Sequence, residues 1–259
     1  MAEHPGGKPI IEVQDFTAAY DGNVVLDKLN FEIYAGEVFA ILGGSGCGKS
    51  TLLKHMIGLY KPAGGRILID GEDIAALSGE ERRKILRKLG VLYQSGALFG
   101  SMTLAQNVRL VLEEFTQLPE EAMDLIARMK LDLVGLKDFA DHLPAEVSGG
   151  MQKRAAIARA MAMDPQILFL DEPSAGLDPI TSAELDALII RLNQSLGVTF
   201  VVVTHELASI FAIAQRIIML DPKTQSIIAE GPPKELRDHS EIPFVQRFFH
   251  REAIATELA

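Results

Sequence analysis

The chain has 259 residues, of which 48% are hydrophobic and 23% charged, so it can bury a sizeable core and lacks the composition of a disordered protein. Its 25 basic and 35 acidic residues give a formal net charge of −10, which argues against general binding of nucleic acid. The single cysteine, Cys47, has no partner for an intrachain disulfide, and the N-terminus shows no charged and then apolar export signal. These features predict a cytoplasmic protein that has no nucleic-acid partner.

No segment reaches the roughly 18 uncharged apolar residues that a membrane-spanning helix needs. Residues 198–220 come nearest, but polar side chains interrupt them at His205, Glu206, Gln215 and Arg216. If this protein works at a membrane, we expect other chains to supply the spans.

The N-terminal part of the chain begins with strand signals and then alternates between strand and helix. Alternating apolar residues and the Asp21-Gly22 pair predict a β layer with a hairpin over residues 1–35. An apolar run over 37–42 predicts a strand, and the spacing over 49–58 predicts a helix after a glycine-rich loop. The same signals predict three later elements, a strand over 65–71, a helix over 78–88 and a strand over 91–93.

Helical spacing replaces the strand signals over residues 95–163, which predicts an inserted helical lobe. Its helices are expected over 104–115, 120–136 and 151–163. Alternation then resumes, with strands over 167–170 and 199–203 and helices over 180–196 and 207–215. Continuous apolar strands joined by helices are typical of a mostly parallel sheet covered on both faces. We expect a core of residues 1–94 and 164–230, the lobe at 95–163 and a proline-interrupted tail at 231–259.

A phosphate-binding loop is predicted at residues 43–51, which match G-x-x-x-x-G-K-[ST] in full between a predicted strand and a predicted helix. Glycines let successive backbone N–H groups turn toward phosphates, and the helix N-terminus adds its positive end. Lys49 is expected to neutralise phosphate charge, and Ser50 to offer its hydroxyl to Mg²⁺. The residues predicted to hold the nucleotide here are Gly43, Gly44, Ser45, Gly46, Cys47, Gly48, Lys49, Ser50 and Thr51.

Two carboxylates, Asp171 and Glu172, follow the apolar strand predicted over 167–170. Phosphoryl transfer in folds with a phosphate loop places a carboxylate in the Mg²⁺ shell, and Asp171 is predicted to fill that role. Glu172 is placed to polarise an attacking water as a general base. An ordinary polar turn is the alternative, and the phosphate loop disfavours it.

The segment 147–154, Val-Ser-Gly-Gly-Met-Gln-Lys-Arg, followed by Ala158-Arg159-Ala160, resembles the signature of ABC-type ATPases, which is L-S-G-G-Q ahead of a helix. Further matches follow in the family's order over nearly the whole chain. Tyr20 takes the place of the aromatic that stacks on adenine, Gln94 that of the Q-loop glutamine, residues 174–178 that of the D-loop, and His205 that of the switch histidine.

The resemblance implies an α/β P-loop NTPase fold: a RecA-like, mostly parallel sheet core with an N-terminal antiparallel β layer and an inserted helical lobe. It implies ATP and Mg²⁺ as cofactors, with the metal held by Ser50, Gln94 and Asp171. The catalytic residues that it implies are Glu172, His205, Lys49 and Gln94.

The same resemblance implies a head-to-tail homodimer around two ATP molecules. By the family pattern, Ser148, Gly149 and Gly150 face the γ-phosphate of ATP on a second chain, and Asp178 couples the two sites. Met151 takes the next position of the signature, which in the family makes ribose or interface contacts. ATP then acts as a ligand with different affinities for an open and a closed state.

The signature departs from the family pattern, because Met151 stands where glutamine is usual and Val147 where leucine is usual. A thioether cannot make the hydrogen bonds of glutamine. The same departure occurs in ATPases of bacterial lipid-trafficking systems that partner MCE-domain proteins, which residues 94–99 and 176–181 also resemble. This resemblance implies phospholipid transport between the inner and outer membranes, with the chain on the cytoplasmic face of the inner membrane. The partners that it implies are integral membrane permease subunits, an MCE-domain protein and a small accessory subunit.

Three alternatives to lipid transport stay open at this point. An importer ATPase for a small solute, such as an amino acid, metal or osmolyte, fits the same motifs. A soluble ABC-type ATPase acting on DNA or the ribosome is disfavoured by the single ATPase domain and the acidic charge. A non-hydrolysing nucleotide clamp is disfavoured by the presence of Glu172 and His205.

Several apolar residues have two interpretations each. Leu98, Phe99 and Met102 either anchor a short coupling helix of a membrane subunit or pack within the helical lobe. The tail phenylalanines Phe244, Phe248 and Phe249 either cover the catalytic core of their own chain or reach a neighbour. Alkylation of Cys47 is expected to block ATP binding, and ATP to protect the thiol; otherwise the residue only fills space in the loop.

Overall fold

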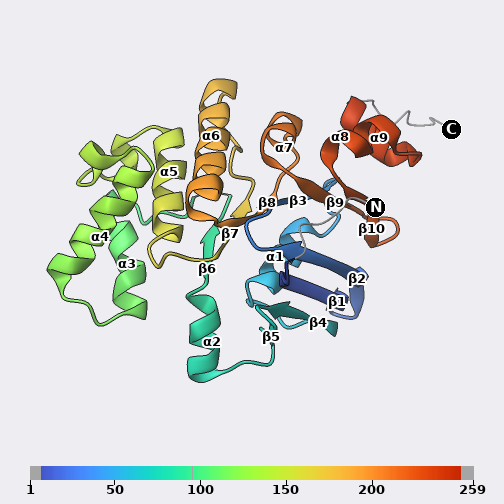
Figure 1. Cartoon of the computed structure of the whole chain (residues 1–259), viewed down its shortest axis with the longest axis horizontal. Coiled ribbons are helices and arrows are strands. Elements are labelled where there is room, and N and C mark those ends of the chain that lie inside the picture. Colours follow the sequence, from blue (N-terminus) through green and yellow to red (C-terminus); the bar gives the residue numbers. More distant parts are fainter. Residues whose placement is uncertain (1–6, 95, 252–259) are drawn as a thin grey trace.

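Two β-sheets organise the chain in the computed structural model, which describes residues 7–94 and 96–251 (Figure 1). The N-terminal sheet has the strand order β2-β1-β4-β5 and pairs its strands antiparallel. Its strands are β1 (Pro9–Tyr20), β2 (Asn23–Tyr34), β4 (Gly64–Ile69) and β5 (Glu72–Asp73). Tyr20 pairs with Asn23 across the Asp21-Gly22 turn, where φ is 50° and 81°, as a two-residue hairpin turn requires. The predicted β layer and its hairpin are confirmed.

The second sheet has the order β10-β9-β3-β8-β7-β6. Its parallel strands are β3 (Val38–Gly43), β6 (Leu89–Leu92), β7 (Ile167–Asp171), β8 (Thr199–Val203) and β9 (Arg216–Asp221), and β10 (Ser226–Gly231) runs antiparallel to β9. Every residue of β3 and β8 is buried, because one face packs on the N-terminal sheet and the helix after β3, and the other face packs on helices. The predicted P-loop NTPase fold is therefore confirmed. β9 and β10 were not predicted as strands.

Helices α1 (Lys49–Met56), α2 (Gly79–Leu86), α6 (Pro179–Leu196) and α7 (Leu207–Ile213) accompany the sheets, near their predicted positions. Figure 1 shows α3 (Leu104–Phe115), α4 (Glu120–Leu133) and α5 (Gly149–Ala160) together at one end of the molecule, joined by two 3-10 turns (Lys137–Phe139 and Pro144–Glu146). The helix predicted over 120–136 ends earlier, because Gly135 has a positive φ of 73°. One hydrophobic core runs from these helices to Leu92, Leu168 and Leu188, so the helical lobe packs directly on the sheet.

The tail forms α8 (Pro233–His239) and α9 (Pro243–His250), which were not predicted as helices. Val245 and Phe249 are buried in a cluster with Ala40, Leu42, Ile210, Ile217 and Met219, and Phe244 and Phe248 pack against that cluster. Up to Arg251, the tail therefore covers the catalytic core of its own chain, and residues 252–259 lie outside the described range. The length and apolar character needed to cross a bilayer are found in no helix of residues 7–94 and 96–251.

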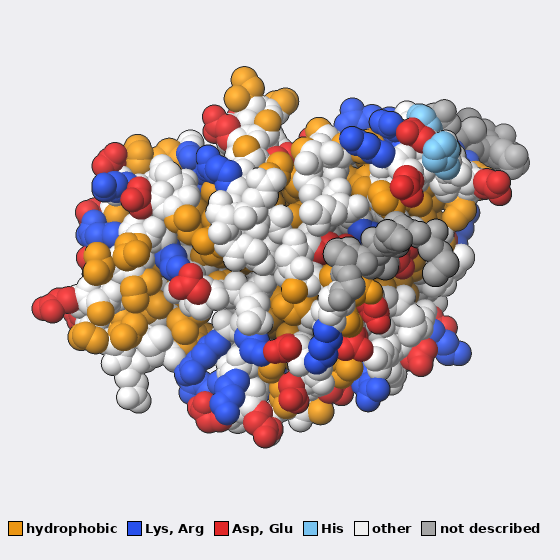
Figure 2. Space-filling view, viewed as in Figure 1, with side chains coloured by type: hydrophobic (Ala, Val, Ile, Leu, Met, Phe, Trp, Pro, Cys, Tyr) orange, Lys and Arg blue, Asp and Glu red, His pale blue; other side chains and the backbone are white. Residues whose placement is uncertain are grey.

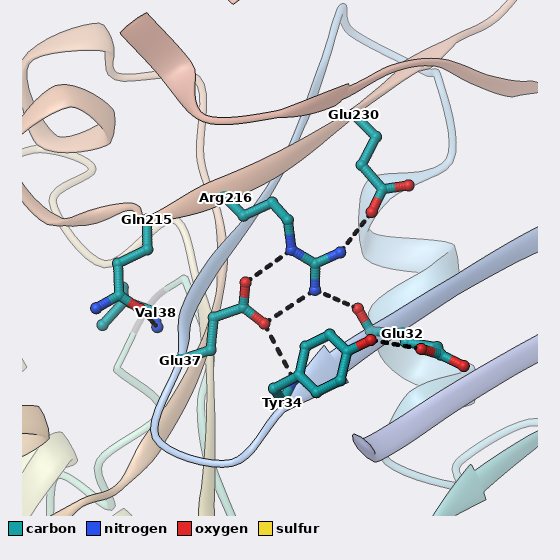
Figure 3. A network of polar contacts seen from close by, with 7 residues as sticks. All are labelled: Glu32, Tyr34, Glu37, Val38, Gln215, Arg216 and Glu230. Carbon is teal, nitrogen blue, oxygen red and sulfur yellow. Dashed lines mark hydrogen bonds and ion pairs between the residues drawn. The ribbon is translucent and has the colours of Figure 1, made fainter. Parts of the chain in front are cut away.

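A buried arginine ties the two sheets together near their shared edge (Figure 3). Arg216, the first residue of β9, makes two hydrogen bonds of 2.8 and 3.0 Å to the carboxylate of Glu37. It also pairs with Glu230 of β10 and donates to the main-chain oxygen of Glu32 in β2. Its guanidinium lies 4.9 Å from the ring centroid of Phe39. A planar, bidentate donor fixes orientation as well as position, so this network sets the N-terminal sheet against the central one.

Candidate active site

The phosphate loop leaves the carboxyl end of β3 and enters α1, in a path that only glycine permits at two points. Gly43 has a φ of 147°, and a Cβ there would lie 2.5 Å from both the Cys47 sulfur and the Leu220 carbonyl oxygen. Gly48 has a φ of 96°, and a Cβ there would lie 2.8 Å from a methyl group of Leu26. The loop is therefore shaped by its glycines, and the N–H groups of the following helix open toward it.

Lys49 lies over this loop, because its ammonium donates to the carbonyl oxygens of Gly43 at 2.8 Å and Gly44 at 3.0 Å. These carbonyl oxygens are neutral, and a negatively charged phosphate oxygen would accept stronger hydrogen bonds from the ammonium. Ser50 is exposed in the first turn of α1, whereas Cys47 is buried. Burial raises the pKa of the Cys47 thiol.

Asp171 and Glu172 lie at the carboxyl end of β7, beside β8, which ends just before His205. The Glu172 carboxylate is 2.8 Å from Nδ1 of His205, and their side chains are 12% and 70% exposed. Glu172 has a positive φ of 47°, and its N–H donates to the Val203 carbonyl oxygen at 2.8 Å. A non-glycine residue in this region of backbone space is uncommon and is found at functional sites. The geometry places an oriented acid–histidine pair at the end of two adjacent parallel strands.

The candidate Mg²⁺ ligands are Ser50, Gln94 and Asp171. Burial, followed by the charge of Glu172, raises the pKa of Asp171, while Lys54, Lys49 and Lys153 oppose that shift. A nearby cation stabilises the ionised form of a carboxylate whose pKa is raised in this way. Mg²⁺ accepts hydroxyl, amide and carboxylate oxygens as ligands. A site with only a few protein ligands leaves coordination positions for water and phosphate. These residues fit the metal.

Tyr20 stands at the end of β1, and the residue is 39% exposed. The Tyr60 ring meets it edge-on at a centroid distance of 5.9 Å, and His55 lies 6.4 Å away. These neighbours fix an aromatic ring that a flat adenine base can contact.

The signature residues begin α5. Ser148 caps this helix, and its hydroxyl accepts the N–H of Met151 at 3.2 Å. Ser148 and Gly149 are exposed, but Gly150 is buried, and a Cβ on Gly150 would lie 2.3 Å from the Thr181 methyl group. The signature turn therefore packs closely against the start of α6.

The departure at Met151 has a structural explanation. The Met151 side chain packs against the core of the helical lobe, and the amide of Gln152 donates to the Pro144 carbonyl oxygen at 2.9 Å. Asp178 caps α6 by accepting the N–H groups of Ile180 and Thr181. The caps made by Ser148 and Asp178 each stay within the helix that the residue begins.

Two cations that the sequence did not single out lie on α5 and contact the segment after β6. Lys153 donates to the main-chain oxygen of Gln94. Arg159 donates to the main-chain oxygens of Gly96 at 2.9 Å and Ala97 at 2.6 Å. Both belong to the segment that resembles the signature, but the pattern predicts no contact for them, since charged residues in a helix usually face solvent.

The possible docking residues behave differently from one another. Leu98 packs against the core of the helical lobe and Met102 is partly buried, but Phe99 is 51% exposed. Asn107 fixes the Phe99 backbone, accepting its N–H at 2.7 Å and donating to its carbonyl oxygen at 3.1 Å. Apolar side chains also gather on the surface over the helical lobe (Figure 2). Leu125 and Met129 of α4 are each 62% exposed.

Comparison with known proteins places these motifs in a family. Residues 26–175 match the ABC transporter family. The chain is 41% identical over 237 residues to the intermembrane phospholipid transport system ATP-binding protein MlaF of Haemophilus influenzae, covering 92% of this chain and 89% of that protein. It is 41% identical over 244 residues to the probable ribonucleotide transport ATP-binding protein mkl of Mycobacterium leprae, covering 94% of this chain and 70% of that protein.

Solved structures agree. The structure of cbiO1 from Clostridium perfringens, part of the ABC transporter complex cbiONQ, aligns with a TM-score of 0.81 at 33% identity, covering 90% of this chain and 92% of that one. The dimeric structure of MJ0796, a bacterial ABC transporter cassette, aligns with a TM-score of 0.77 at 34% identity, covering 86% of this chain and 98% of that one. The chain therefore belongs to the ABC transporter family, as an ATP-binding and ATP-hydrolysing subunit.

Proposed function

We propose that two copies of this chain close head to tail around two MgATP molecules and so drive phospholipid transport between the inner and outer membranes of a bacterium. The observation that carries the proposal is the division of the site. The phosphate loop, Asp171, Glu172 and His205 gather at the carboxyl ends of the central strands, whereas Ser148 and Gly149 are exposed at the start of α5. An exposed helix N-terminus favours an anion, and the dimeric cassette MJ0796 supports the assembly that would bring one to it.

The residues of one chain divide the chemistry among them. Lys49 exchanges its two carbonyl acceptors for phosphate oxygens, and Tyr20 contacts the adenine. Ser50, Gln94 and Asp171 would hold the metal, which would supply positive charge to neutralise the phosphates. Glu172 orients the attacking water and accepts its proton.

His205 and Glu172 act as a pair in this proposal. Nδ1 of His205 points to the Glu172 carboxylate, so Nε2 is left for the γ-phosphate. Glu172 thereby orients His205 toward the γ-phosphate. Release of phosphate removes one of the two hydrogen-bond partners of His205.

The membrane partners follow from the resemblance and from one exposed side chain. Phe99, held by Asn107 and half exposed, is the proposed anchor for a permease subunit on the cytoplasmic face of the inner membrane. An MCE-domain protein and a small accessory subunit complete the proposed complex. Similarity to MlaF supports phospholipid as cargo. The similarity to mkl favours a second candidate, an importer for a small solute such as a ribonucleotide.

The test is affinity purification of the tagged protein from gently solubilised membranes of its source, followed by mass spectrometry of proteins and lipids. A permease recovered with an MCE-domain protein and phospholipid is the expected result. A permease with a solute-binding protein would replace phospholipid by a small solute, and the absence of a membrane protein would overturn transport. Phe99→Glu should lose the permease, while Phe139→Glu, which changes another exposed phenylalanine of the helical lobe, should keep it.

A further inference from the structure

Lys153 is a buried cation close to the proposed catalytic carboxylates. It lies on α5, and only 7% of the residue is exposed, which is rare for a lysine. Its ammonium donates to the main-chain oxygen of Gln94, a residue 59 positions earlier in the chain. Burial lowers the pKa of Lys153, and the charges of Asp171 and Glu172 oppose that shift. The ammonium therefore lies within electrostatic reach of both carboxylates while it holds the backbone of Gln94.

Arg159 makes the same kind of contact further along α5. Its guanidinium donates to the carbonyl oxygens of Gly96 and Ala97 at 2.9 and 2.6 Å. Burial lowers the pKa of Arg159 as well, with Tyr93 opposing the shift. Two cations of one helix thus hold the segment that carries Gln94 at three backbone oxygens.

These contacts join parts of the site that face different nucleotides in the proposed dimer. The N-terminal end of α5 is Ser148, which faces the nucleotide of the second chain. Gln94 faces the metal and phosphates bound by its own chain. A helix of 12 residues is a rigid connection between them, because its backbone hydrogen bonds resist bending.

We propose that Lys153 is a positioning residue for ATP hydrolysis, which holds the backbone of Gln94 and makes the segment with Gln94 follow α5 when the dimer closes. The inference rests on the proposed function, because it uses the roles of Gln94 and Ser148 given there. Without the ammonium, the Gln94 carbonyl loses its donor and the two carboxylates lose a nearby positive charge. Gln94 can then stand away from the position in which it completes the metal shell.

The decisive variant is Lys153→Met, which keeps the length of the side chain and removes the ammonium. We expect kcat to fall by about 10- to 100-fold, the range that a displacement near 1 Å can cause, and the Mg²⁺ concentration for half-maximal rate to rise. Affinity for ATP measured without Mg²⁺ should change less than about threefold, since the phosphate loop is untouched. Lys153→Arg should restore most of the rate, and Lys137→Met, at an exposed lysine of the helical lobe, should match wild type.

A double-mutant cycle with Gln94→Ala separates positioning from a general loss of structure. If Lys153 acts through Gln94, Lys153→Met should cost little more in the Gln94→Ala background, and losses that multiply independently would overturn the proposal. If the Met variant does not fold by thermal melting, Lys153→Leu, which also removes the donor, takes its place in the cycle with the same expectation. Wild-type kcat and Mg²⁺ dependence in these variants would overturn the positioning role alone. A wild-type protein without ATPase activity would instead overturn the proposed function.

Discussion

The two halves of the proposed composite site are built in different ways on this chain. The nucleotide half is formed where β3, β7 and β8 end, and its groups contact one another across long stretches of sequence, as Glu172 does with His205. The signature half is formed by two helix N-termini, in which Ser148 and Asp178 each cap the helix that they begin. The first half is organised by one folded chain. The second half has its polar groups satisfied locally and faces solvent, so we expect its functional contacts to come from another chain.

The largest expected effect is in the nucleotide half. Glu172→Gln should lower the rate of ATP hydrolysis by about 10²- to 10⁴-fold, the usual contribution of a general base, and keep ATP affinity. Size-exclusion chromatography with MgATP should then show a persistent dimer. Glu206→Gln, which removes a neighbouring carboxylate that makes no side-chain cap, serves as the control. A monomeric Glu172→Gln protein with wild-type hydrolysis would exclude the general-base role.

The second prediction tests whether the halves come from different chains. Lys49→Ala removes the loop ammonium and Ser148→Arg blocks the signature turn, so each protein alone should lose roughly 100-fold or more in rate. In a mixed dimer, one site pairs the intact loop of one chain with the intact signature of the other. An equal mixture should recover about a quarter of the wild-type rate if the dimers form at random and the sites act independently.

Controls keep that result specific. Ser195→Arg, at an exposed position of α6, should keep its ATPase activity by itself, and recovery of activity in the mixture should not depend on it. Since Ser148 also caps α5, thermal melting must show that Ser148→Arg remains folded. A mixture no more active than the sum of its two components would place both halves of each site on a single chain.

The nucleotide half is also the part that the sequence predicts best, and the reason is locality. Residues 43–51 specify a loop by their own glycines, and the apolar run before Asp171 specifies a strand, so both motifs are recognisable without knowledge of the rest of the fold. The helices of the lobe follow from spacing alone, and α3 begins and ends where it was expected. Tertiary contacts are needed for the remainder.

Two kinds of feature escaped prediction for physical reasons. β9 begins with Arg216, a charged residue whose burial depends on Glu37, 179 positions away in the chain. Lys153 belongs to a segment that is helical by its spacing, but only the fold brings Gln94 to its ammonium. The tail helices begin at prolines, which suit the first turn of a helix as well as a break in one. No local sequence pattern distinguishes such residues from residues that face solvent.

The third prediction uses two aspartates that differ in the direction of their pKa shifts. Burial raises the pKa of Asp171, so its ionised form opposes folding at every pH above that pKa. Hydrogen bonds from Thr181 lower the pKa of Asp178, so its ionised form stabilises the fold above its unfolded pKa, and that stability is lost as the pH falls through the folded pKa. In nucleotide-free protein at pH 7, Asp171→Asn should raise Tm by a few degrees, and Asp178→Asn should lower it.

Melting curves from pH 7 downward check both signs. Each difference from wild type should shrink as the corresponding aspartate becomes protonated in the native protein. Asp171→Asn should at the same time lose Mg²⁺-dependent hydrolysis, because a stability gain at a functional carboxylate costs activity. A lower Tm for Asp171→Asn would show that the buried carboxylate is compensated by its lysine neighbours.

The smallest expected effect concerns a chemical rate and leaves the fold unchanged. Cys47 is 1% exposed, and burial raises the pKa of its thiol, so its reaction with iodoacetamide at pH 7 should be at least about tenfold slower than that of a free thiol. The rate should keep rising as the pH passes the ordinary thiol range, and ATP should slow it further by holding the loop closed. Ser45→Cys in a Cys47→Ser background places the only thiol at an exposed position of the same loop and should react readily. Equal rates of alkylation for the two thiols would mean that the loop opens faster than the reagent attacks. The nucleotide half would then be no more preorganised than the signature half.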